Sequence, residues 1–178
     1  MDIPNVIGDW QEYQSEEWAG LRVRVHNLKK ATPPCGRDDD AKGLIYVSFQ
    51  VTFENRGKEF YNIDLRRYPG DFQVRVGSDG HAAFVDRYGS DLIEDYNLYP
   101  PRRATAVIYA AATPARLKQI DIQISPDIDG QTAFGYHWVG GLGIHEGSTR
   151  ASARASTAKP SVANQVEQFL KDAAPGDA

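Results

Sequence analysis

The chain has 178 residues, a formal net charge of −4 and a single cysteine, Cys35. Its length fits one domain with a core of its own plus a tail, and its charge argues against a strongly basic surface built to bind nucleic acid. One cysteine excludes an intrachain disulfide, so packing must hold the fold.

The first residues lack the basic and apolar regions of a signal peptide. The chain has no run of about 18 apolar residues, so we expect no membrane span. We expect a cytoplasmic protein if Met1 is the native start, and an extracellular or cell-envelope protein if a signal peptide has been removed before it. Val6, Ile7 and Trp10 are expected to anchor a short edge strand.

Residues 20–28 (GLRVRVHNL) alternate apolar side chains with Arg22, Arg24 and His26, which predicts a strand with one face in water. Residues 29–42 have no period and predict a loop. Residues 43–57 (GLIYVSFQVTFENRG) alternate strictly and are rich in β-branched and aromatic side chains. They predict a long, half-buried central strand with a turn at its end.

Alternation continues along the chain and predicts strands at 59–65, 71–77, 83–85, 103–111, 117–125 and 132–139. Residues 78–80 (SDG) predict the tight turn of a hairpin. Residues 86–102 are polar and predict a long loop. In the last strand, Phe134, Tyr136 and Trp138 are predicted to share one face, and core burial explains Trp138 better than a carbohydrate platform does.

Seven to eight strands with one apolar face each, and no helical spacers, predict an all-β fold of antiparallel sheets packed face to face. The favoured architecture over residues 1–146 is an immunoglobulin-like β-sandwich, with an up-and-down barrel as the alternative. Residues 147–160 predict a flexible linker. Residues 161–174 predict a C-terminal amphipathic α-helix, which either covers its own sandwich or docks on a partner. Its apolar stripe is Val162, Val166, Phe169 and Leu170.

Residues 46–125 resemble the DUF4352-type immunoglobulin-like (telokin-like) family of small bacterial domains. Three pieces carry the likeness: VSFQVTFENRG at 47–57, FQVRVGSDGHAAF at 72–84, and LYPPRRATAVIYAAATPARLKQIDIQIS at 98–125. The resemblance implies a domain with a binding role, in a family whose members are mostly secreted, lipid-anchored or envelope-associated. This chain departs from the family in lacking a signal or lipidation sequence, and in its linker and C-terminal helix.

No catalytic motif stands out in the sequence. The histidines, His26, His81, His137 and His145, show no metal-ligand spacing, and no base is placed beside Cys35. Solvated turns explain the aspartates better than calcium binding does, and these are Asp38, Asp39, Asp40, Asp127 and Asp129. We therefore expect no catalytic residue, no required metal and no cofactor.

Tyrosines and arginines of the predicted loops have the strongest binding chemistry, because they combine large contact area with directional hydrogen bonds. If these loops share one end of the sandwich, they form a recognition patch. Alternatively, the tyrosines cap the core and the arginines pair with Asp64, Asp71, Asp86 and Asp91. The candidate binding residues are Arg66, Arg67, Tyr68, Arg87, Tyr88, Tyr96, Tyr99, Arg102 and Arg103.

These features predict a non-catalytic binding or adaptor domain, with a protein partner or self-association through the tyrosine and arginine loops, the C-terminal helix, or both. One alternative is a small-molecule-binding protein or small enzyme with a pocket under the 86–102 loop. Another is a structural subunit of a larger assembly.

Overall fold

The computed structural model describes residues 3–143, which form strands and three short 3-10 helices and contain no α-helix. The predicted linker and C-terminal helix lie outside these residues. Within the described part, no helix is long and apolar enough to cross a membrane. The 3-10 helices are η1 (Glu16–Trp18), η2 (Asp39–Ala41) and η3 (Arg116–Lys118). The strands are β1 (Asn5–Val6), β2 (Trp10–Glu12), β3 (Leu21–Lys30), β4 (Ile45–Asn55), β5 (Tyr61–Leu65), β6 (Phe72–Val76), β7 (His81–Ala82), β8 (Phe84–Asp91), β9 (Ile93–Leu98), β10 (Arg103–Ala112), β11 (Ile120–Ile124), β12 (Asp127–Ile128), β13 (Gln131–Thr132) and β14 (Tyr136–Gly140).

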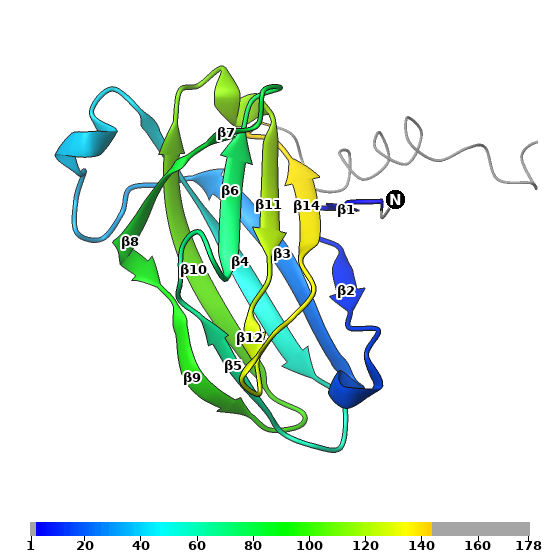
Figure 1. The fold of residues 1–178 in the computed structure, drawn as a ribbon. Coiled ribbons are helices and arrows are strands. Elements are labelled where there is room, and N and C mark those ends of the chain that lie inside the picture. Colours follow the sequence, from blue (N-terminus) through cyan, green and yellow to red (C-terminus); the bar gives the residue numbers. More distant parts are fainter. Residues whose placement is uncertain (1–2, 144–178) are drawn as a thin grey trace, which may run out of the picture.

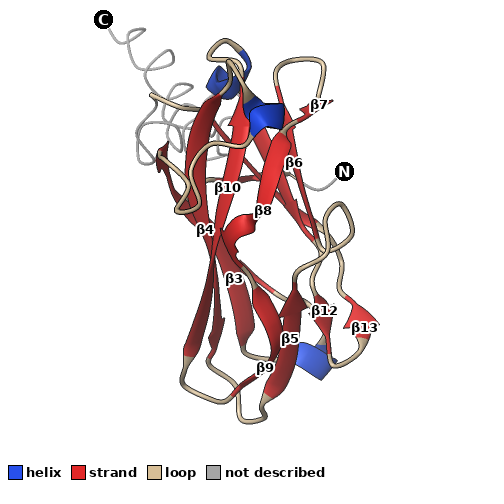
Figure 2. Ribbon diagram, turned by 90° about the vertical axis from the view of Figure 1, so that its left-hand side faces the viewer, coloured by secondary structure: helices blue, strands red, loops and turns tan. Residues whose placement is uncertain are grey.

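The strands make a β-sandwich of two layers, as the sequence predicts (Figure 1). One layer is the sheet β2-β3-β4-β10-β8. The other combines the sheet β1-β14-β11-β6-β7 with the sheet β13-β12-β5-β9. Figure 2 shows the layers from the side, with β3, β4 and β10 facing β5, β6 and β12. The pairings are antiparallel except that β1 runs parallel to β14.

The central strand β4 confirms the prediction for residues 43–57 in position and in its buried inner face. It pairs with β3 on one side and β10 on the other. Its outer face differs from the prediction, because Ser48, Thr52 and Glu54 are buried as well. Arg22 and Arg103 from the neighbouring strands bind Glu54, and His26 and Thr105 form hydrogen bonds with Thr52. The apolar side chains of both layers fill the core; the largest are Trp138, Phe49, Phe53, Phe72, Leu21, Ile63, Leu65 and Leu98.

The predicted loop over residues 86–102 is wrong, because most of this segment is strand. β8 pairs with β10 in one layer, and β9 pairs with β5 in the other. Both ladders contain a register shift, at which the pattern of alternation breaks. Ile93 and Leu98 are buried at the two ends of β9, and the residues between them are exposed. Residues 86–102 therefore do not form the long loop under which a pocket was predicted.

The predicted common face of Phe134, Tyr136 and Trp138 is wrong at its first residue. Trp138 is 0% exposed, as expected, but Phe134 is 59% exposed. The chain changes partner between the two, since β13 pairs with β12 and β14 pairs with β11. A single period therefore does not run through residues 132–139.

Candidate binding face

Neighbouring strands of the first layer bring one tryptophan and three arginines together on the outer surface of the sheet. Arg22 on β3 lies opposite Glu54 on β4, and Glu54 lies opposite Arg103 on β10. Trp10 on β2 lies opposite Arg24 on β3. Because side chains two residues apart on a strand share a face, these five side chains form one cluster, which we call the tryptophan–arginine face.

The Trp10 ring is surrounded by guanidinium groups. The Cζ atoms of Arg22, Arg24 and Arg103 lie 4.0, 4.6 and 5.7 Å from its ring centre. At such distances a cation is attracted to the electron-rich face of the indole, most strongly where water is excluded. The ring therefore holds three charged side chains in defined positions on a flat sheet surface.

Glu54 is the acidic centre of this face and is buried. Arg22 donates through Nε and Nη2 to its Oε1 at 3.2 and 2.9 Å, and Arg103 Nε donates to its Oε2. Burial alone would raise the pKa of Glu54, but the hydrogen bonds and charges of Arg103 and Arg22 outweigh it and lower the pKa below its usual value. Glu54 is therefore ionised at neutral pH and fixes two of the three arginines.

Arg24 is the arginine that this carboxylate leaves unused. Among residues 3–143 it forms no ion pair, and its Nε is buried without a hydrogen-bond partner. A buried donor without an acceptor is unfavourable. The face therefore carries more positive charge than Glu54 neutralises, and the partly exposed Arg24 side chain is not used by an acidic group within residues 3–143.

The lowered pKa of Glu54 predicts an acid-dependent contribution to stability. A carboxyl whose folded pKa lies below its unfolded value, about 4.3, stabilises the fold above that value. The contribution is lost as the pH falls through the folded pKa. We expect the difference in unfolding free energy between the natural chain and Glu54→Gln to be constant above about pH 5 and to shrink below about pH 4. Urea titrations across this range measure it; a difference that grows towards low pH would contradict the assignment.

The tyrosines and arginines predicted to form one patch are divided between separate places. In the β5–β9 ladder, Tyr61 lies opposite Leu98, and Leu65 lies opposite Ile93. The turn after Leu65 and the turn after Leu98 therefore lie at opposite ends of this ladder (Figure 1). The first turn carries Arg66, Arg67 and Tyr68, and the second carries Tyr99 and Arg102. Arg103 begins β10, and Arg87, Tyr88 and Tyr96 belong to β8 and β9.

The first turn is held by ion pairs between its arginines and nearby carboxylates, which is the alternative to a recognition patch. Arg66 pairs with Asp64 at 3.0 Å and with Glu94, and Arg67 pairs with Asp71 at 2.9 Å. In the other segments, Tyr99 stacks on Phe60, with ring centres 4.9 Å apart, whereas Tyr88 is 91% exposed. The predicted pairing with Asp86 is not what the structure has, since this carboxylate accepts a hydrogen bond from the backbone N–H of Gly89.

The other candidates for chemistry have local partners. Asp38 accepts from the N–H of Asp40 at the start of η2, and Asp129 accepts from the N–H of Asn62, which supports their interpretation as turn residues. His26 shares a hydrogen bond with Thr52, and His137 with Asp121. Cys35 is exposed, and His145 lies outside the described residues. Across residues 3–143 no group of three or more His, Cys, Asp or Glu side chains is placed to hold a metal ion.

The sequence pattern places Arg22 and Arg24 on the water-facing side of a strand but does not mark them as binding residues. The alternation of β3 is a signal for their common face. Their position beside Trp10 and Arg103 depends on the register of β2 and β10 against their neighbours, which the sequence pattern does not specify.

No protein-family model matches the chain, so the resemblance to the DUF4352-type family stays a prediction. No curated protein sequence matches it either. Among solved structures, the yjhA protein of Bacillus subtilis is similar in fold, with a TM-score of 0.52 and 12% identity over 78% of this chain and 99% of that one. The ycdA protein of Bacillus subtilis, a candidate lipoprotein, has a TM-score of 0.50 and 13% identity over 90% of this chain. The chain spans about half of that protein, 47% of its length. At such identities the likeness shows the fold alone.

Proposed function

We propose that the chain is a non-catalytic immunoglobulin-like binding domain that docks an acidic protein segment on its tryptophan–arginine face. The observation that carries the proposal is Arg24, which is stacked on Trp10, is partly exposed and forms no ion pair within residues 3–143. A partner carboxylate would supply an ion pair and a charge-assisted hydrogen bond to its guanidinium.

The composition of the face favours a protein partner. Tryptophan and arginine are enriched among the few residues that provide most of the binding energy in protein interfaces. The side chains here are already fixed by Glu54 and by the indole ring, so little conformational entropy is lost when a partner binds. The three arginines exceed the carboxylates of the face, even with Glu12, which lies opposite Arg22 on β2, counted beside Glu54. The whole chain, in contrast, is negative. The partner surface that complements this charge is acidic.

Two further surfaces and a cellular location are proposed in addition to the tryptophan–arginine face. The exposed ring of Tyr88 and the neighbouring Arg87 lie on β8, in the same layer as the face, and would extend an interface beyond it. A docking role for Val162, Val166, Phe169 and Leu170 concerns residues outside the described part. An extracellular or envelope setting is also proposed, with the description of the ycdA protein as its support.

Removal of the Arg24 charge tests the proposal without disturbing an ion pair. A random copolymer of glutamate and tyrosine serves as the acidic polypeptide probe. We expect the natural chain to bind it, and Arg24→Gln to weaken the affinity about tenfold, about 1.4 kcal/mol. Binding is followed by fluorescence anisotropy of the labelled copolymer, and it should weaken as salt is added.

Arg75→Gln is the matched control, because Arg75 is an exposed arginine on β6 of the other layer. It removes the same charge from the chain and should change the affinity less than about twofold. Equal affinities of the two variants would overturn the proposal. Tighter binding of heparin or of anionic lipid vesicles than of the copolymer would also overturn it, in favour of a polyanion or a membrane surface.

A further inference from the structure

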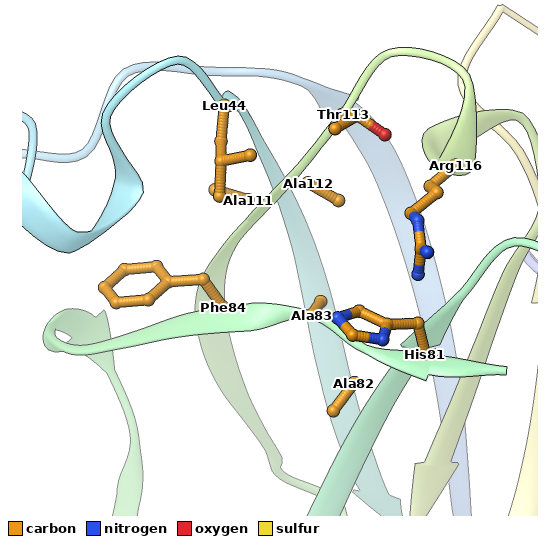
Figure 3. A pocket seen from close by; sticks show the side chains of 9 residues that line it. All are labelled: Leu44, His81, Ala82, Ala83, Phe84, Ala111, Ala112, Thr113 and Arg116. Carbon is orange, nitrogen blue, oxygen red and sulfur yellow. The ribbon is translucent and has the colours of Figure 1, made fainter.

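A pocket of about 460 Å³ opens where the chain crosses from β7 to β8, beside the end of β10 (Figure 3). Its floor is formed by Ala111 and Ala112, which are buried, and by Ala83. These small side chains leave space that larger residues would fill. The pocket lies at the opposite end of β10 from Arg103, and none of its lining residues belongs to the tryptophan–arginine face.

One wall of the pocket is apolar and fixed by packing. Phe84 contacts Tyr46 edge to face, with ring centres 6.4 Å apart. Leu44 and Phe84 belong with the buried residues Ala111 and Tyr46 to a small hydrophobic cluster that is separate from the main core. Figure 3 shows Leu44 and Phe84 on the side of the pocket away from its charged residues. An apolar ligand body would therefore contact preformed surface.

The other wall carries Arg116 and His81, which approach the pocket from different elements (Figure 3). The Arg116 stem lies against Gly77, where an added Cβ would be 3.3 Å from Arg116 Cγ. The N–H of Gly77 also donates to the Arg116 carbonyl at 3.1 Å. These contacts hold η3 and the β6–β7 turn together and place the base of the Arg116 side chain beside the pocket.

Part of that guanidinium has no partner. Arg116 Nη2 forms an ion pair with Asp79 at 3.3 Å, but both side chains are partly exposed, so this pair is weak. Arg116 Nη1 is buried and has no hydrogen-bond acceptor among the described residues. Leaving a buried donor unpaired costs free energy. The Arg116 side chain is itself partly exposed and lines the pocket, so a negatively charged ligand there can bind the part of the guanidinium that Asp79 does not use.

We propose that this pocket binds a small carboxylic acid, with its carboxylate on Arg116 and its short apolar body on Ala111, Ala112 and Phe84. A planar guanidinium has five N–H donors, and the Asp79 pair uses only Nη2, so the remaining donors suit one further carboxylate. A phosphate would need more donors than this largely apolar lining offers beside Arg116, His81 and Thr113. The pocket volume lies in the range of small-molecule sites, roughly 300–1,000 Å³.

Binding of hexanoate to the isotope-labelled full chain, followed by backbone amide shifts in NMR spectra, tests this assignment. We expect saturable shifts at residues 81–84 and 111–113. Hexanamide has the same apolar body without the charge, and acetate has the charge without the body. Each should bind at least about fivefold more weakly than hexanoate.

Arg116→Gln should weaken hexanoate about tenfold. The control is Lys118→Gln, which removes a charge from the same 3-10 helix but not from the pocket lining, and it should change the affinity less than about twofold. Equal binding of hexanoate and hexanamide, or equal effects of the two substitutions, would overturn the proposal. The carboxyl end of a peptide presents the same chemistry, so N-acetyl-leucyl-leucine is titrated in parallel. Tighter binding of the peptide than of hexanoate would assign a chain terminus as the source of the carboxylate, and weaker binding would assign a free acid.

Discussion

Replacing Trp138 by alanine is expected to lower the free energy of unfolding by about 3–5 kcal/mol. The side chain is fully buried, and the other core residues cannot collapse completely into the space it would leave. Its Nε1–H also donates to the carbonyl of Asp9 at 2.9 Å, which joins β14 to the connection between β1 and β2. The substitution therefore leaves both a cavity and an unpaired carbonyl, and urea unfolding measures their combined effect.

Phe134→Ala is the control for this prediction, because the sequence places Phe134 on the same face as Trp138 whereas the structure exposes it. We expect a loss below about 1 kcal/mol for Phe134→Ala. Similar losses for the two variants would contradict the arrangement of residues 132–139. Trp138→Phe, which keeps most of the volume, should retain more than half of the stability that alanine loses.

Asp71→Ala is expected to lower the free energy of unfolding by about 3 kcal/mol. The carboxylate is 1% exposed, and its Oδ2 accepts from the backbone N–H groups of Arg66 and Arg67 at 3.0 and 2.9 Å. Its Oδ1 accepts from the Arg67 side chain at 3.1 and 2.9 Å. Alanine would leave the two backbone N–H groups without their acceptor in the turn between β5 and β6 and would remove the ion pair to Arg67. Thermal and urea unfolding both measure the loss.

Asp121→Ala is the matched comparison, because Asp121 also forms a hydrogen bond, with His137, but both side chains are nearly half exposed. Its loss should stay below about 0.5 kcal/mol. If Asp71→Ala were equally mild, the turn would not depend on its carboxylate. Arg66 and Arg67 would then not be needed to hold the turn. This result would favour the prediction that they bind a partner.

The fold follows from the sequence wherever one face of a strand is buried and the other is not. Residues 61–65 and 120–124 have a strict period of two, and both are strands with buried alternate residues. The pattern fails at β8 and β9, where edge strands with register shifts carry polar residues on both faces. It also fails for the two-residue strands β1, β7, β12 and β13, which are too short to show a period.

The candidate binding face depends on information that a local pattern does not contain. The alternation of β3 places Arg22 and Arg24 on one face, but Trp10 and Arg103 reach them only through strand pairing. Pairing across β10, β4 and β3 brings together residues that are far apart in the chain. The sequence predicts that tyrosines and arginines of the loops bind a partner. The residues that cluster in the structure are instead three arginines of β3 and β10 around Trp10 of β2.

The three tryptophans allow a direct test of the proposed binding face. Trp10 is partly exposed among the arginines, whereas Trp18 and Trp138 are buried. The measurement is an NMR titration of the indole N–H signals of the full chain with the glutamate–tyrosine copolymer. We expect the Trp10 signal to shift and saturate and the Trp18 and Trp138 signals to stay in place. We also expect Arg24→Gln to weaken binding, so that a higher copolymer concentration is needed for the same Trp10 shift. A copolymer that binds without moving the Trp10 signal would contradict the proposed binding face.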